Sequence, residues 1–544
     1  MALAGCSARP DGGAPAAPAS PADAARFLTQ ATFGPTDASI AAVRSGSYAD
    51  WIDQQIAMPL QAESHLAFME RRLPELRAAN PGAQLTANEF YGSFWNQAVG
   101  APDQLRQRMK LALSEIFVVS LADPNVDERG AASYYDMLGA NAFGNFRTLL
   151  EQVSLHPTMG VYLTWLANQK EDGVRHPDEN YAREVMQLMT IGLYQLNPDG
   201  TRRLDANGQA IPTYGSDDIS GLAKVFTGYS WYAANPTNTV TFFGRGLAPE
   251  AQVRSMIAYP IYHSTSAKTF LGTTIPANPT PNPAGDLRVA LDTLFNHPNT
   301  GPFISRQLIQ RLVTSNPSPA YVARVAAVFA NNGAGVRGDM AMVVKAILLD
   351  AEARNAPAAS DVTYGKLREP VVRMTNWARA FGAMSTSGNW TINSTSANTS
   401  LNQSALTSPS VFNFWRPGYS PPNTRMGAAG LVAPEFQVVD EVTVAGYLNT
   451  IQTAIDSGAG RDVRATYPAE TEMAVDPRAL ADRVNLLLMS GQMSPRLRDR
   501  ITTTVGAVAI PANGTAAQIA TARLNRVKLA VFMTMASPEY LAQR

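Results

Sequence analysis

The segment around which the rest of this chain is interpreted reads His176-Pro177-Asp178-Glu179-Asn180-Tyr181-Ala182-Arg183-Glu184-Val185-Met186-Gln187-Leu188-Met189, followed by Thr190-Ile191-Gly192. Its first residues are typical of a helix start, because proline is tolerated in the first turn and acidic side chains suit the positive end of the helix dipole. The sequence therefore predicts a helix over 177–191. Polar residues spaced i, i+3, i+4 and i+7 share one face of it: Asn180, Arg183, Glu184 and Gln187.

Apolar residues flank this polar face on both sides. A surface helix usually has a broad polar side, so these inverted proportions predict that the polar face points into a cleft or a buried network. Buried charges persist only when they are paired. Two i,i+4 pairs are available, Glu179 with Arg183 and Asn180 with Glu184. The helix is therefore either a structural ion-pair network or the carrier of a catalytic or ligand-binding carboxylate with a shifted pKa.

The composition limits the class of protein. The chain has 544 residues, 45% of them hydrophobic, and its formal net charge is zero. This length is enough for two or three cores, or for one large helical body with insertions. Balanced charge argues against a nucleic-acid binder, which would carry a basic excess. Charged residues make up only 16%, and small and polar residues fill the difference, as is common in exported proteins.

The single cysteine, Cys6, excludes a disulfide framework and a cysteine-rich metal site. Its surroundings, Leu3-Ala4-Gly5-Cys6-Ser7, resemble the lipobox of bacterial lipoproteins, in which the cysteine is lipidated. A stretch rich in Pro, Gly, Ala and Ser follows as a tether. We interpret residues 1–22 as a lipoprotein leader remnant with its tether. No run of eighteen apolar residues predicts a transmembrane helix, so the expected membrane contact is through the lipid anchor alone.

The region from Asp23 onward is mainly helical in pattern. We expect one large multi-helix body over 23–544, with 355–365 as the place where a sub-division would fall. Thr36 is predicted to cap the second helix. The expected helices are 24–33, 36 onward, 48–56, 102–120, 130–153, 177–191, 216–230, 285–295, 301–314, 318–332, 338–352, 364–382, 436–457, 477–490, 494–506 and 514–536.

Strand signals are few. Two strong turns, Asn197-Pro198-Asp199-Gly200 and Asp205-Ala206-Asn207-Gly208, predict a small β-hairpin. Thr239-Val240-Thr241-Phe242-Phe243 is a second strand candidate. Two long polar loops, 232–285 and 384–425, complete the expected architecture, and loops of such length often carry function.

Several motifs together point to a family. They are Arg26-Phe27-Leu28, Ala31-Thr32-Phe33-Gly34-Pro35, Glu179-Asn180-Tyr181-Ala182-Arg183-Glu184, His297-Pro298-Asn299-Thr300, Lys366-Leu367-Arg368-Glu369-Pro370, Ser408-Pro409-Ser410-Val411-Phe412-Asn413-Phe414 and Ser537-Pro538-Glu539-Tyr540. With these motifs the chain resembles the exported bacterial family labelled domain of unknown function 1800 (DUF1800) over about residues 23–544. The resemblance implies a mostly helical, extracytoplasmic protein. It also implies, by analogy, an exported sulfatase-like companion protein.

The candidate site residues lie on the polar helix and in the segments that follow it. His263 sits in the first long loop with Lys268 shortly after it, and a rigid scaffold often positions such loop residues for binding. His263 and Lys268 near a Glu/Asn/Arg helix would suit an anionic group or acid/base chemistry. The expected catalytic residues are Glu184, Glu179, His263 and Asp217, and the expected substrate-binding residues are Asn180, Arg183, Lys268 and Trp231.

Other chemistries find less support in the sequence. Glycoside hydrolysis needs two carboxyl groups about 5–10 Å apart, so Glu184 would need a partner such as Asp217 or Asp218 from the next helix start. No zinc-binding HExxH motif, GxSxG elbow, Walker loop or dinucleotide fingerprint occurs. We predict no cofactor and assign no metal ligands, although the histidines and carboxylates leave a metal ion open.

Two hypotheses for the function follow. In the first, the protein is an exported, lipid-anchored hydrolase that acts on a glycan-like envelope or environmental polymer in a polar helical cleft. In the second, it is a non-catalytic binding or scaffold lipoprotein that works with the sulfatase-like partner. Both place the protein outside the cytoplasm and without nucleic acid.

Overall fold

A computed structural model describes residues 16–235, 237, 239–357 and 361–544. Cys6 and most of the predicted tether lie outside these residues. Within the described chain there are 25 α-helices, and the eight strands have only two or three residues each. The prediction of a mainly α fold is therefore confirmed. No helix of the described chain is long and apolar enough to cross a membrane.

The first third of the chain is a series of capped helices. Ser20 caps the first of them, which carries proline in its first turn, and Thr36 caps the second by accepting from the backbone N–H of Ser39, as predicted. The helices are α1 (Pro21–Ala31), α2 (Asp37–Arg44), α3 (Tyr48–Ala57), α4 (His65–Ala79), α5 (Ala87–Gly100), α6 (Gln104–Ser114), α7 (Glu128–Ala140), α8 (Phe146–Leu155) and α9 (Pro157–Tyr162).

The middle of the chain holds α10 (Asn180–Gln187), α11 (Ser216–Val225), α12 (Thr239–Phe242), α13 (Pro283–Asn296), α14 (Thr300–Leu312), α15 (Pro319–Ala330), α16 (Met340–Leu349), α17 (Ala351–Arg354) and α18 (Pro370–Ala380). The last part holds α19 (Arg425–Ala428), α20 (Glu441–Ser457), α21 (Pro468–Met473), α22 (Pro477–Met489), α23 (Pro495–Gly506), α24 (Ala516–Met535) and α25 (Pro538–Leu541). Three 3₁₀ helices, η1 (Pro249–Gln252), η2 (Pro260–Tyr262) and η3 (Pro434–Val438), lie between them.

The eight short strands pair two by two, always antiparallel. The pairs are β1 (Tyr229–Ser230) with β2 (Ile257–Ala258), β3 (Lys268–Phe270) with β4 (Thr273–Ile275), β5 (Lys366–Leu367) with β8 (Ala542–Gln543), and β6 (Met384–Ser385) with β7 (Val463–Arg464). The predicted hairpin also forms. Bridges join Leu196 to Arg202 across the first predicted turn and Leu204 to Ala210 across the second.

Several predictions about elements are wrong. The predicted helix 364–382 begins only at Pro370, because Lys366–Leu367 is strand β5, and the predicted helix 102–120 ends at Ser114. Residues 239–243 are not a strand, because Thr239–Phe242 is the short helix α12, where the Phe242 ring stacks 4.0 Å from the Tyr262 ring, so aromatic packing overrides the β-propensity of the segment. The predicted helix 130–153 is two helices, α7 and α8, separated at Asn141–Asn145. The segment 232–285 is not one irregular loop, since it contains α12, the 3₁₀ helices η1 and η2, and the strands β2, β3 and β4.

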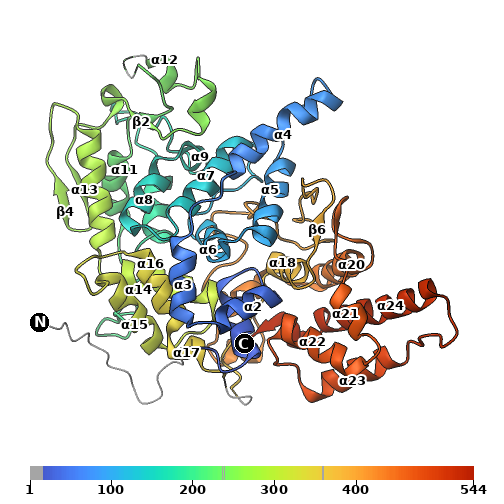
Figure 1. The fold of residues 1–544 in the computed structure, drawn as a ribbon. Coiled ribbons are helices and arrows are strands. Elements are labelled where there is room, and N and C mark those ends of the chain that lie inside the picture. The colour runs from blue at the N-terminus through green and yellow to red at the C-terminus, as the bar shows by residue number, and fades with distance from the viewer. Residues whose placement is uncertain (1–15, 236, 238, 358–360) are drawn as a thin grey trace, which may run out of the picture.

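One hydrophobic core cluster runs through the molecule, from Ala24 in α1 to Tyr540 in α25. Helix α1, near the beginning of the described chain, packs against α22 in its last part, and Asp37 forms an ion pair with Arg483 of α22. Figure 1 shows the C-terminus beside α2, with α22, α23 and α24 grouped at one end of the molecule and α13 and β4 at another. Segments far apart in the sequence therefore build the central part of the fold.

Candidate functional site

Helix α10 carries most of the site residues that the sequence predicts, but it is short. It spans eight residues and begins at Asn180, three residues later than predicted, because Asp178 Oδ1 accepts from the Asn180 backbone N–H in a turn before the helix. Leu188 closes the helix rather than continuing it to residue 191. The predicted apolar flanks are buried: Tyr181, Ala182, Val185, Met186 and Met189 are all in the core cluster.

The polar face of α10 lies at the protein surface. Glu179 and Arg183 form the predicted i,i+4 ion pair at 3.4 Å, and both side chains are more than 40% exposed. Such a pair contributes little to stability, since water screens it. Asn180 donates to Thr164 Oγ1, and Glu179 accepts from Ser220 Oγ at 2.6 Å, which ties α10 to α11. The buried network expected at this face therefore does not form.

Glu184 is the exception on this face. Its side chain is 7% exposed, and its Oε2 atom has no hydrogen-bond partner among the described residues. Burial raises the pKa of Glu184, and the neighbouring Arg183 opposes this increase only in part. The structure therefore places a carboxyl group that holds its proton more tightly than a free glutamate does beneath an exposed polar surface.

His263 and Lys268 belong to a different, sealed cluster. His263 is 0% exposed, with Nδ1 at 2.8 Å from the Thr227 carbonyl oxygen and Nε2 at 3.0 Å from Asp286 Oδ2. Lys268 Nζ lies 2.8 Å from the same Asp286 oxygen. Within the described residues, the His263 ring nitrogens contact Thr227 and Asp286, and they make no hydrogen bond or ion pair with α10. This cluster fastens the segment after β1 to α13, and sequence reasoning missed Asp286 as its shared partner.

The remaining predicted residues are also dispersed. Asp217 is exposed in the first turn of α11, whereas Asp218 is engaged with backbone N–H groups of Gly215 and Leu271. Trp231 is half-buried, and its carbonyl oxygen accepts from the Tyr259 hydroxyl group. No group of three or more His, Cys, Asp or Glu side chains able to hold a metal ion occurs in the described residues. The structure thus brings Glu179, Asn180, Arg183 and Glu184 together at one helix, and no hydrogen bond or ion pair of the described residues joins them to the other candidates.

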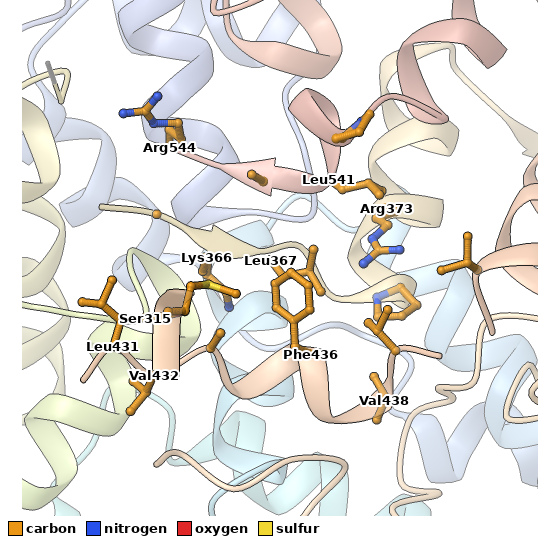
Figure 2. Close-up of a pocket in the computed structure, with 18 of the residues that line it drawn as sticks. Ser315, Lys366, Leu367, Arg373, Leu431, Val432, Phe436, Val438, Leu541 and Arg544 are labelled. Atoms are coloured by element: carbon orange, nitrogen blue, oxygen red, sulfur yellow. The ribbon is translucent and has the colours of Figure 1, made fainter. Parts of the chain in front are cut away.

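A well-formed pocket lies elsewhere, over the β5–β8 pair. Its volume is about 560 Å³, within the range typical of ligand pockets in proteins. Its walls are mostly apolar and include Leu367, Leu401, Leu431, Val432, Phe436 and Val438. Figure 2 shows Phe436 in the middle, with Leu431 and Val432 to one side and Val438 and Arg373 to the other.

Five separate segments build this pocket. The strand pair β5–β8 matches Lys366 with Gln543 and Leu367 with Ala542, and η3 packs against β5. α20 contributes Thr443, Val444, Tyr447 and Leu448, and residues 315–316 close another side. The second long polar loop, 384–425, contributes Leu401. The short strand pair therefore forms the base of the pocket, and the irregular segments beside it supply apolar side chains to the wall.

A buried ion network supports this base. Lys366 Nζ lies 3.3 Å from Glu369 Oε1 and 3.1 Å from Glu435 Oε1, and Arg108 Nη2 lies 3.2 Å from Glu369 Oε1. Burial opposes ionisation of Glu369, but Arg108 and Lys366 outweigh it and lower its pKa to about 2. Burial and the Glu369 charge instead raise the pKa of Glu115, the neighbouring carboxyl group. The Lys366 charge is therefore neutralised on the interior side of the pocket.

Arg373 is the second buried cation at the pocket. It is 5% exposed, its Nε donates to the Arg368 carbonyl oxygen at 2.7 Å, and its guanidinium carbon lies 4.8 Å from the centre of the Tyr447 ring. Burial lowers the pKa of Arg373. The sequence identifies Lys366-Leu367-Arg368-Glu369-Pro370 only as a family motif. Its closely spaced charges next to apolar residues are the sequence feature that could have indicated a buried ion network here.

The fold and these sites define a large helical protein with an apolar pocket over a buried ion network. The family comparison adds to this description. The chain belongs to the family described as protein of unknown function (DUF1800), whose model matches residues 26–542. The resemblance predicted from the sequence is thereby confirmed over nearly the whole chain. No curated protein and no solved structure matches the chain.

Proposed function

We propose that this protein is a non-catalytic binding protein that holds a small apolar or amphipathic molecule in the pocket over β5 and β8. One observation carries the proposal: a pocket of about 560 Å³ walled mainly by apolar side chains. Such pockets gain binding free energy by removing apolar ligand surface from water. This proposal follows the second of the two hypotheses drawn from the sequence, with the binding site moved from α10 to the pocket.

Exposed valines at the pocket give further support. Val362 is 87% exposed, and Val439 and Val444 are also exposed. Apolar side chains that are clustered and exposed often mark a surface that another molecule covers. These side chains would lie against the part of a ligand that projects from the pocket.

A filling substitution tests the proposal. Titration with N-phenyl-1-naphthylamine, an uncharged fluorescent probe, should give saturable binding to the wild-type protein. Val438→Trp places a large ring in the pocket and should weaken this binding about tenfold or more, since the added volume competes with the probe. Val174→Trp, at an exposed valine outside the pocket, is the matched control and should bind as wild type does. Absence of saturable binding, or equal binding by both variants, would contradict the proposal.

The proposed place of action is outside the cytoplasm, on a membrane through lipidated Cys6, with an exported sulfatase-like protein as companion. The lipobox-like Leu3-Ala4-Gly5-Cys6 supports the anchor, and the family resemblance supports the companion. Labelled palmitate should be incorporated into the wild-type protein expressed behind an added bacterial export signal, and not into Cys6→Ala expressed in the same way. Equal labelling of the two proteins would reject the anchor.

Hydrolysis of a glycan-like polymer at α10 is the second candidate, because Glu184 has the property that a general acid needs. Its carboxyl group is buried, its pKa is raised, and exposed Arg183 and half-exposed Asn180 lie on the same helix as possible substrate contacts. Release of reducing sugar from an envelope polysaccharide should then fall by about 10²-fold or more in Glu184→Gln. A well-folded Glu184→Gln protein that keeps full activity would reject this candidate.

A further inference from the structure

We propose that the pocket ligand is an anionic amphiphile, a molecule with a carboxylate or phosphate head and an apolar tail, and that Arg373 binds the head. The inference rests on the proposed binding function and adds the chemical class of the ligand. It depends on the burial of Arg373, on the absence of a carboxylate partner for it among the described residues, and on its position relative to the apolar wall.

Arg373 differs from Arg108 and Lys366, the two cations of the neighbouring ion network. Arg108 and Lys366 each have Glu369 within 3.3 Å. In the described part of the chain, Arg373 has no ion-pair partner, and its only side-chain hydrogen bond runs from Nε to the Arg368 carbonyl oxygen. Its two terminal nitrogens are thus left without an acceptor at a pocket-lining position. A buried charge of this kind is unfavourable unless an anion or a hydrogen-bond acceptor meets it.

The charges around the pocket favour an anion. The lining contains Lys366, Arg373 and Arg544, against Asp361 as its only carboxylate side chain in the described residues. The interior carboxylates Glu369 and Glu435 already neutralise Lys366. Arg544 donates to the Asp361 carbonyl oxygen at 2.6 Å. Among the described residues, Arg373 is therefore the pocket cation that is available to bind an anionic ligand.

The geometry separates a head site from a tail site. A guanidinium group binds a carboxylate or phosphate through two parallel hydrogen bonds, which gives it preference over a lysine ammonium at such a site. Figure 2 shows Arg373 on one side of Phe436, with Leu431 and Val432 on the opposite side. A tail that leaves an acidic head at Arg373 would pass the Phe436 ring toward Leu431. The Tyr447 ring contacts the Arg373 guanidinium group through a cation–π interaction.

Calorimetric titration of the wild-type full chain with four probes tests the ligand class directly. Decanoate and decyl phosphate, below their micelle concentrations, should both bind. n-Decanol should bind about tenfold or more weakly, because charge-assisted hydrogen bonds are the strong ones. Inorganic phosphate alone should not bind measurably, since it lacks the tail. Binding of only one of the two anionic amphiphiles would narrow the head group to a carboxylate or to a phosphate and would still support the inference.

The other outcomes overturn the inference in distinguishable ways. If n-decanol binds as tightly as decanoate, the anionic head is rejected while the apolar binding function stands. If no decyl compound binds, the proposed function itself fails. If inorganic phosphate binds as tightly as decyl phosphate, the site is an anion site without a role for the apolar wall.

Variants assign the head group to Arg373. Arg373→Met should reduce the preference for decanoate over n-decanol about tenfold or more, and Arg373→Lys should retain part of that preference, because the charge remains while the planar fork is lost. Arg496→Met, at an exposed arginine of α23 outside the pocket, controls for net charge. Unchanged preference in a folded Arg373→Met protein would assign the head to another residue. Should this variant fail to fold, Arg373→Lys and the wild-type titrations still decide the inference.

Discussion

Charged side chains in this protein differ mainly in how their burial is compensated. Arg108, Lys366 and Glu369 compensate one another in a buried network, so the positive charges lower the pKa of Glu369 to about 2 in spite of its burial. Glu184 and Arg373 are buried without such compensation. The first group maintains the fold, and the second group is where a ligand or a proton would have most effect.

At the scale of single residues, Glu184→Gln should make the protein more stable at pH values above the ordinary pKa of a glutamate side chain. Burial raises the pKa of Glu184 in the folded state, so the folded state holds its proton more tightly than the unfolded state does. Stability therefore falls as pH rises from the unfolded value toward the folded value, and the loss persists at higher pH. Glutamine does not titrate in this pH range, so the variant does not lose this part of its stability as pH rises. Melting temperatures of wild type and variant should agree near pH 4 and diverge by pH 7, with the variant higher.

A matched substitution separates this effect from a change in net charge. Asp217→Asn removes an exposed carboxylate in the first turn of α11 and should not reproduce the pH-dependent gain of Glu184→Gln. A Glu184→Gln protein that melts below wild type at neutral pH would instead show that the ionised carboxylate has a stabilising partner.

At the scale of single residues, the sequence predicted which side chains are polar and close on one helix, but not which contacts they make. The Glu179–Arg183 pair followed directly from helical spacing and is present. His263 was expected near that helix because both lie in one region of the sequence. Its actual partner, Asp286, belongs to α13, and only the path of the chain through β3 and β4 decides that contact.

At the scale of elements, the end of α10 depends on Gly192. The backbone N–H groups of Ile191 and Gly192 both donate to the Met186 carbonyl oxygen, and Gly192 adopts a φ of +71°. A Cβ atom at Gly192 would lie 2.8 Å from a ring carbon of Phe303 on α14. Glycine is therefore needed at this position for two reasons: the backbone is left-handed, and α14 packs too close for a side chain.

Gly192→Ala should destabilise the protein by about 2–3 kcal/mol, because left-handed strain and overpacking against Phe303 add. Gly208→Ala is the matched control, since Gly208 has a φ of +76° with no atom within 4 Å of the added Cβ, and should cost about 1 kcal/mol. Urea unfolding of the three proteins measures the difference. Equal costs for the two substitutions would show that Phe303 moves aside without penalty.

Helices with strong local signals were predictable, and those with mixed signals were not. Thr36, with Asp37 in the first turn, identified α2 because capping is a local interaction. The sequence analysis missed α4 and α5, whose patterns are weaker: α4 contains Pro74 in its interior, and α5 is buried around much of its surface. Such helices form through tertiary packing rather than through a clear apolar stripe.

At the scale of the whole molecule, the pocket is the feature that the sequence could not supply. Its lining comes from residues 315–316, 361–373, 401, 426–448 and 536–544, which the fold brings together. No short motif contains such a site, because its shape depends on the pairing of β5 with β8 near the two ends of the last third of the chain. The fold class and the family, in contrast, were accessible from helical spacing and from motifs spread along the chain.

The most direct test of the central claim is hydrogen–deuterium exchange of the full chain with and without saturating decanoate or n-decanol. The account predicts slower amide exchange in 361–373, 431–448 and 536–544, which line the pocket, and unchanged exchange in α10. Unchanged exchange in all three pocket segments, or slower exchange centred on α10, would contradict it.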